Sequence, residues 1–234
     1  MKKYIIFLLV FLMVPTFSNA GGMEDDPLLT MLVVDQFEMR DTEGEETFVW
    51  DAEGWVGKDL HKLWVKTEGE YIDGDFEDAE LQLLYSRAVA PFWDMQFGWK
   101  HDFRPRPSRD WLALGVKGLA PYYFDIDAAI FVGDAGRTAA RLQAEYELML
   151  TQKWVLVPEV ELNLFGKDDR ETGTGSGLSN IEAGLRLRYE IRREFSPYVG
   201  VNWTRLFGNT ADYAREEGED TDDIQLVFGL RFWF

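Results

Sequence analysis

The chain has 234 residues, of which 46% are hydrophobic, and its formal net charge is −18 at neutral pH. A chain this acidic argues against a nucleic-acid partner. It contains no cysteine, which excludes a fold built on disulfide bonds.

The first twenty residues have the pattern of a secretory signal peptide. Two lysines precede the apolar run YIIFLLVFLMV, and Ser18 to Ala20 supplies small residues for cleavage. The apolar run is too short for a membrane-spanning helix, and no later segment has 18 consecutive apolar residues. We therefore expect residues 1–20 to be a signal peptide and residues 21–234 to be a single exported domain, either soluble or an outer-membrane barrel.

The exported part of the sequence predicts about twelve strands and no long helix. Segments of roughly ten residues, bounded by turn residues, follow one another without a Pro/Ser-rich linker. This pattern indicates one all-β domain. The predicted strands are, in chain order, about 28–40, 47–56, 62–70, 77–87, 93–103, 110–119, 123–132, 138–149, 154–165, 179–190, 197–207 and 223–234.

Apolar and polar residues alternate within these strands, so each strand has two different faces. In the strand at 138–149, for example, Leu142 lies on the apolar face, and Arg141 and Glu145 lie on the polar face. The alternation continues to the last residue, Phe234. The chain therefore ends in a strand and not in a polar tail.

The connections decide between a soluble sandwich and a membrane barrel, because both show this alternation. Short turns flanked by aromatic residues, such as APFW at 90–93 and APYY at 120–123, alternate with polar loops, of which 166–178 and 208–222 are the longest. Short turns at one end, long loops at the other and an even strand number are typical of outer-membrane barrels. We predict an all-β fold, a single transmembrane antiparallel up-and-down β-barrel of about twelve strands. Its apolar face would meet lipid, and both termini would be periplasmic.

Long runs of the sequence also resemble the copper resistance protein B family of Gram-negative outer membranes. YSRAVAPFWD (85–94) and GLRLRYEIRREFSPYVGVNW (184–203) carry the likeness, which extends from about residue 48 to the end. The resemblance implies an outer-membrane protein of copper homeostasis or resistance that binds copper or passes it across the membrane, with periplasmic copper proteins as partners. Members of the family carry a Met- and His-rich segment before the barrel. Residues 21–46 depart from that pattern, because they contain three methionines and no histidine.

The candidate copper ligands are Met23, Met31, Met39 and His101. Thioether sulfur suits Cu(I), and imidazole suits Cu(II). Met31 and Met39 have the same parity as Asp35, which predicts that all three face the lumen. Ordinary packing is the competing interpretation for the methionines, and a solvated position at a strand end is the competing interpretation for His101.

A second set of candidates is formed by charged residues on the polar faces of the strands. Arg186 and Arg188 are expected to pair with Glu159 and Glu161 on the preceding strand. Interior salt bridges that fill a small barrel are the simpler interpretation, and a cation-preferring lumen is the functional one, since acidic residues outnumber basic ones inside. The predicted lumen-lining charges are Glu80, Arg141, Glu145, Glu159, Glu161, Arg186, Arg188 and Arg231.

Three functions remain open at this point. The first is a non-enzymatic copper-homeostasis protein, and the second is a passive small-solute or cation channel. The third is an enzyme of the outer-membrane phospholipase type, which needs a Ser–His pair. Neither Ser86 nor Ser108 is well placed to pair with His101, so we expect no enzyme.

The end of the chain predicts two partners. Phe234 resembles the C-terminal recognition signal of outer-membrane barrels, so we expect the barrel assembly machinery to bind the last strand. The apolar faces predict outer-membrane lipid as the second partner.

Overall fold

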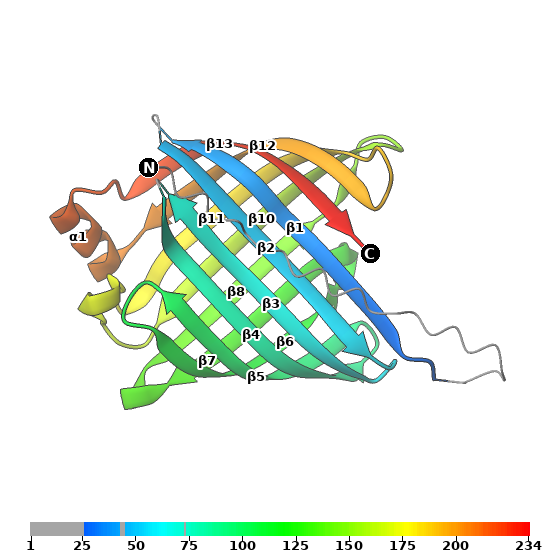
Figure 1. Ribbon diagram of the computed structural model, residues 1–234, viewed down its shortest axis with the longest axis horizontal. Coiled ribbons are helices and arrows are strands. Elements are labelled where there is room, and N and C mark those ends of the chain that lie inside the picture. The colour runs from blue at the N-terminus through cyan, green and yellow to red at the C-terminus, as the bar shows by residue number, and fades with distance from the viewer. Residues whose placement is uncertain (1–25, 43–44, 73) are drawn as a thin grey trace, which may run out of the picture.

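A computed structural model describes residues 26–42, 45–72 and 74–234 of the chain. Strands dominate it, with a single α-helix and three short 3₁₀ turns among the described residues (Figure 1). The strands are β1 Leu29–Thr42, β2 Glu45–Gly57, β3 His61–Ile72, β4 Asp75–Ala90, β5 Trp93–Arg104, β6 Arg109–Ala120, β7 Phe124–Gly133, β8 Thr138–Tyr146, β9 Leu148–Met149, β10 Trp154–Phe165, β11 Gly177–Tyr189, β12 Phe195–Leu206 and β13 Asp222–Trp233. The other elements are α1 Gly208–Glu217, η1 Pro121–Tyr123, η2 Asp134–Gly136 and η3 Arg170–Thr172.

The strands form one closed antiparallel sheet. Apart from the two-residue β9, each strand pairs with its neighbours along the chain, and β13 pairs with β1 to close the ring. The short β9 continues β8 along β10 in the same register, so the wall has twelve strands. The predicted all-β barrel of twelve strands is confirmed.

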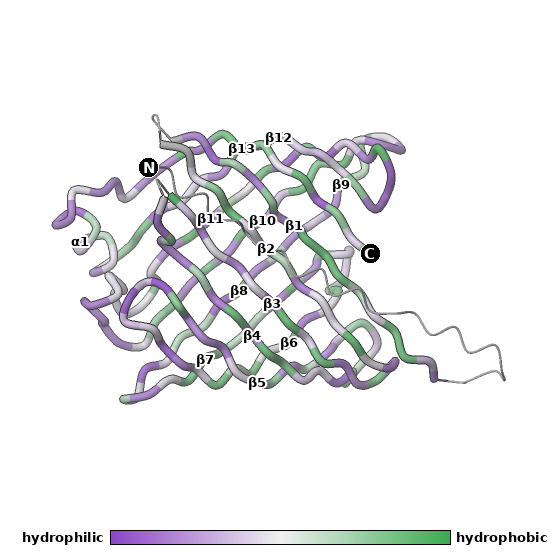
Figure 2. The backbone as a smooth tube through the Cα atoms, in the orientation of Figure 1, coloured by the Kyte–Doolittle hydropathy of each residue, from purple (hydrophilic) through white to green (hydrophobic). Residues whose placement is uncertain are grey.

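The outer face of the wall is apolar. Leu112 on β6 and Ile224 on β13 are 69% and 70% exposed, and hydrophobic and hydrophilic residues alternate along the strands in Figure 2. So large an exposed apolar surface is unfavourable in water and favourable in hydrocarbon. Phe92 and Tyr122, in the turns that contain the two predicted Pro motifs, are also exposed, as expected for rings at the level of the lipid headgroups.

The two ends of the barrel differ. The first and last strands meet at one end, where the Phe234 amide donates to the Leu32 carbonyl at 2.8 Å. We call this the short-turn end, because connections such as 58–60 and 91–92 are brief there. The opposite, long-loop end carries the 166–176 loop and α1, which lies at the left of Figure 1.

Helix α1 lies in a segment that the sequence predicts as a polar loop. Gly218, in the left-handed region with φ of 87°, ends it. The helix contacts the 166–176 loop, where hydrogen bonds from the backbone amide of Ser176 and from Asn209 hold the pKa of Asp168 below its ordinary value. Among the described residues, no helix has the length and apolar character needed to cross a membrane.

An apolar cluster fills part of the barrel interior. Its buried members come from β3, β4, β6 and β7, so it narrows the lumen on that side. Two lysine ammonium groups lie over its rings, Lys100 at 4.7 Å from the Phe131 centroid and Lys117 at 5.3 Å from the Trp64 centroid. The buried members of the cluster are Trp64, Leu84, Trp111, Ala113 and Phe131.

Candidate functional site

A β-bulge in β1 brings additional polar side chains into the lumen. The register against β2 shifts between Val34 and Gln36, which leaves Asp35 as an extra residue. One extra residue reverses the side-chain alternation beyond it. As a result, Gln36, Glu38 and Arg40 are all buried inside the barrel. Glu38 and Arg40 were not among the predicted lumen-lining charges, although their parity is opposite to that of Asp35 and two charges on an outward-facing row are a signal of a break in the alternation.

The bulge also corrects the prediction for the methionines. Met31 precedes it, lines the lumen and packs against the apolar cluster. Met39 follows it and is 49% exposed on the outer face of the wall, so the prediction that Met31 and Met39 share the lumen is wrong for Met39. His101 lies on the outer face of β5, where its Nδ1 is 2.8 Å from Asp110 Oδ1. Met23 lies outside the described residues.

The candidate copper ligands therefore do not converge on one site. Of those within the described ranges, only Met31 lines the lumen. In the same part of the chain, no group of three or more His, Cys, Asp or Glu side chains is arranged to hold a metal ion. These residues do not fit a resident copper centre.

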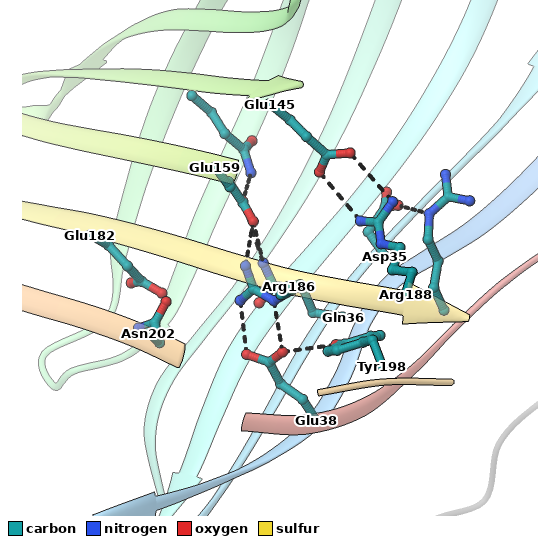
Figure 3. Close-up of polar contacts among 12 residues, drawn as sticks. Asp35, Gln36, Glu38, Glu145, Glu159, Glu182, Arg186, Arg188, Tyr198 and Asn202 are labelled. Atoms are coloured by element: carbon teal, nitrogen blue, oxygen red, sulfur yellow. Dashed lines mark hydrogen bonds and ion pairs between the residues drawn. The ribbon is translucent and has the colours of Figure 1, made fainter. Parts of the chain in front are cut away.

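The most completely enclosed charges form a network between β1 and β11 (Figure 3). Glu38 accepts hydrogen bonds from Nε and Nη2 of Arg186, each at 3.0 Å. Arg40 Nε and the Tyr198 hydroxyl also donate to it, both at 2.8 Å. Arg186 Nη1 donates in turn to Glu159 on β10 at 2.7 Å. Every charge in this network has a partner of opposite sign, as burial requires.

Arg141 forms a second connection, across the lumen. It projects from β8 and reaches β3 and β4, from which it is separated in the wall by β5, β6 and β7. Its Nη2 lies 3.0 Å from Glu80 Oε2, its Nη1 contacts Glu68, and its Nε donates to Asn163 at 3.1 Å. Lys100 also binds Glu80. Arg141 thus spans the interior of the barrel from β8 to β3 and β4.

One of the two predicted interstrand pairings forms. Arg186 binds Glu159, but Glu161 lies 3.5 Å from Arg141 Nε instead of near Arg188. Arg188 is opposite Val155 in the β10–β11 register. That position is closer to the short-turn end than Glu161 is, and there Arg188 binds Glu145 and Glu147, on the other side of β10. The structure places all the predicted lumen-lining charges inside the barrel, namely Glu80, Arg141, Glu145, Glu159, Glu161, Arg186, Arg188 and Arg231.

The described residues enclose at least two cavities in the remaining lumen. The larger, of about 940 Å³, includes Tyr123, Met149 and Trp233 in its lining, so we call it the short-turn cavity. The smaller, of about 440 Å³, includes Leu206 and Thr221, so we call it the long-loop cavity. Six residues line both cavities, so the cavities meet where Arg141 crosses the lumen, and we call this place the narrowing: Gln36, Asp51, Glu68, Arg141, Gln143 and Glu159.

The lining of the long-loop cavity is strongly acidic. Its basic members are Arg40 and Arg141, and carboxylates greatly outnumber them. A low-dielectric funnel of one charge sign attracts ions of the opposite sign, so this end of the lumen attracts cations. The carboxylate residues are Asp51, Glu68, Glu70, Asp78, Glu159, Glu161, Glu182, Glu219, Asp220, Asp222 and Asp223.

The sequence is similar to that of known copper resistance proteins. Residues 28–234 match the family described as Copper resistance protein B precursor (CopB). The chain is 47% identical over 218 residues to the copper resistance protein B homolog of Pseudomonas syringae pv. tomato, and 42% identical over 220 residues to copper resistance protein B of Escherichia coli. Each comparison covers 93% of this chain and 74% of the relative.

Solved structures share the architecture at low sequence identity. The NanC porin superposes with a TM-score of 0.57 at 10% identity, covering 87% of this chain and 99% of the porin. Outer membrane phospholipase A from Escherichia coli gives a TM-score of 0.51 at 13% identity, covering 87% of this chain and 92% of the phospholipase. At these identities the likeness shows the fold alone.

Proposed function

Because this chain belongs to the copper resistance protein B family and forms an outer-membrane β-barrel, we propose that it passes copper ions through its lumen. The acidic lining of the long-loop cavity is the observation that carries the proposal. Carboxylates focused in a confined mouth raise the local cation concentration, and the short-turn cavity continues the polar route. Copper is the cargo in this proposal, and its ligands along the route are mainly oxygens.

The proposed activity is passage without catalysis. A phospholipase-type reaction needs a serine and a histidine within hydrogen-bond reach. Ser86 is fully buried on the lumen side, where its hydroxyl donates to Asp94 at 3.2 Å. His101 lies on the outer face of the wall and binds Asp110. The two side chains therefore lie on opposite sides of the sheet, which supports a role without hydrolysis.

We also propose the orientation of the barrel and its partners. The long-loop end would face outward, and both termini would be periplasmic, so that periplasmic copper proteins meet the short-turn cavity. Phe234, 68% exposed beside the outer face, would be recognised by the barrel assembly machinery. Its neighbour Trp233 lines the short-turn cavity, which supports opposite roles for the last two side chains.

Copper flux into liposomes tests the proposed function. Vesicles that contain the purified barrel and an entrapped copper-sensitive dye should take up Cu(II) faster than vesicles without protein. They should take it up faster than a neutral sugar, because the acidic mouth favours cations. Copper entry at the rate of protein-free vesicles would rule the function out. Equal permeation of sugar and copper would assign the barrel to the passive small-solute channels.

A further inference from the structure

The narrowing between the two cavities contains one carboxylate that lacks a protein partner. Glu159 is bound by Arg186, and Glu68 is bound by Arg141. Asp51 makes no ion pair or hydrogen bond with any residue in the part of the chain that the structure describes, although it lines both cavities. A carboxylate without a cationic protein partner leaves its oxygens free to contact a cation that enters the lumen.

The strand register concentrates negative charge around Asp51. Gln36, Asp51, Glu68, Glu80 and Asp102 lie directly opposite one another on β1 to β5, in one row around the wall. Like charges opposite one another on neighbouring strands repel. A cation beside Asp51 would reduce this repulsion.

Two cationic side chains contact the other three carboxylates of this row. Lys100 contacts both Glu80 and Asp102, and Arg141 contacts Glu68 and Glu80. Asp51, at the β2 position of the row, receives neither of them. Asp51 is therefore the carboxylate of this row that no described cationic side chain contacts.

Arg141 restricts the same part of the lumen. Its guanidinium forks onto Glu80, from β8 to β4, and also reaches Glu68 on β3. A planar fork held by two carboxylates is more rigid than a single-point contact. Asp51, Gln36, Gln143 and Glu159 line both cavities together with Arg141.

We infer that this narrowing selects the ions that cross the barrel, with Asp51 contacting the passing cation and Arg141 limiting the width. The inference rests on the proposed function, since it assumes that ions pass through the lumen. It goes further in naming the residues that determine specificity. The class of ion selected is a small hydrated cation, and neither thioether nor imidazole ligands take part at this point of the route.

The test measures reversal potential and single-channel conductance in KCl with the full-length mature barrel in planar bilayers. Asp51→Asn should lower the ratio of cation to anion permeability by about fivefold or more, because removing a unit charge close to the ion path raises the cation's free energy there by about 1 kcal/mol. Asp51→Glu should keep the wild-type ratio. Arg141→Lys, which keeps the charge but not the fork, should raise the conductance and leave the ratio unchanged.

Asp125→Asn is the matched control. Asp125 lines only the short-turn cavity and has no ion pair or hydrogen bond within the described ranges, so the variant removes an equal charge away from the narrowing. Its effect on the ratio should be clearly smaller than that of Asp51→Asn. Equal effects of the two variants, an unchanged ratio in Asp51→Asn, unchanged conductance in Arg141→Lys, or no conductance in the wild type would each overturn the inference.

The outcome is separable from the copper proposal, because the KCl measurement contains no copper. A barrel that shows the Asp51 effect in KCl but no copper flux in liposomes would support the selective narrowing and reject copper as the cargo. A barrel that passes copper but shows no effect of Asp51→Asn in KCl would support copper as the cargo and reject the narrowing as the selective step.

Discussion

Glu38 and Arg186 form an ion pair that is buried in the interior of the barrel. Each is 1% exposed, and together they share two hydrogen bonds between strands that are not neighbours. Removing one member of such a pair is costly, because the remaining charge stays buried without compensation. The pair therefore connects a local feature, the bulge in β1, to the stability of the whole ring.

We predict that Glu38→Ala lowers the free energy of unfolding by about 3 kcal/mol or more. Tyr198→Phe, which removes only one donor to the same carboxylate, should cost about 1 kcal/mol. Urea unfolding of the refolded barrel, followed by heat-modifiable migration on gels, measures both changes. Arg215→Gln serves as the control, since its ion pair with Asp212 is exposed on α1 and should contribute almost nothing. A Glu38→Ala barrel as stable as the Tyr198→Phe barrel would mean that the network does not stabilise the fold.

At the scale of single elements, the strands were predictable because their signal is local. Alternation with period two places β10 at 154–165, which are the bounds that the structure shows. The bulge in β1 was not predictable in the same way, because it depends on pairing with β2. Helix α1 was missed because its sequence is polar and short, and its environment is set by a loop distant in the sequence.

The candidate site was predictable only in part, for a related physical reason. Parity assigns Arg141 and Glu80 to the lumen, and the structure places them there. Their contact joins residues 61 positions apart, and it follows from closure of the ring and not from either strand alone. The narrowing likewise depends on which side chains meet across the barrel. Alternation along one strand carries no information about that.

The last strand offers a test of face assignment. Phe234→Ser should reduce the amount of barrel in the outer membrane much more than Trp233→Ser, because the Phe234 ring is exposed at the outer face of the wall and the Trp233 ring lines the lumen. The Phe234 backbone bonds to Leu32 are available to serine as well, so the comparison isolates the side chain. Fractionation of cells that express each variant with its signal peptide measures the difference. Similar losses for both variants would show that the assembly machinery does not read the Phe234 side chain.

At the scale of the whole molecule, negative charge is distributed unevenly along the route. The charged residues of the long-loop cavity are eleven carboxylates and two arginines, whereas five basic side chains share the lining of the short-turn cavity with the carboxylates. The apolar cluster occupies one side of the interior. A cation from the long-loop side would therefore meet an attractive mouth, then the narrowing, and then a more balanced chamber.

Measurements at low and high salt should separate two contributions to the cation preference. One comes from the carboxylates at the mouth of the long-loop cavity, such as Glu219 and Asp220, and the other comes from Asp51 in the narrowing. The Debye length is about 10 Å at 0.1 M and about 3 Å at 1 M, so charges at the exposed mouth act over a distance only at low salt. We predict that Glu219→Gln/Asp220→Asn lowers the cation preference at 0.1 M KCl and has almost no effect at 1 M. Reversal potentials at the two concentrations measure this.

The effect of Asp51→Asn should persist at 1 M, because the passing ion comes into contact with that carboxylate and little electrolyte fits between them. Asp212→Asn/Glu216→Gln is the control for the mouth variant. It removes the same charge from α1, at exposed positions outside the lining of either cavity, and should leave the cation preference near the wild-type value. If it matches the mouth variant, the preference arises from the net charge of the molecule. If the Asp51→Asn effect also vanishes at 1 M, the selective step is not a contact within the narrowing.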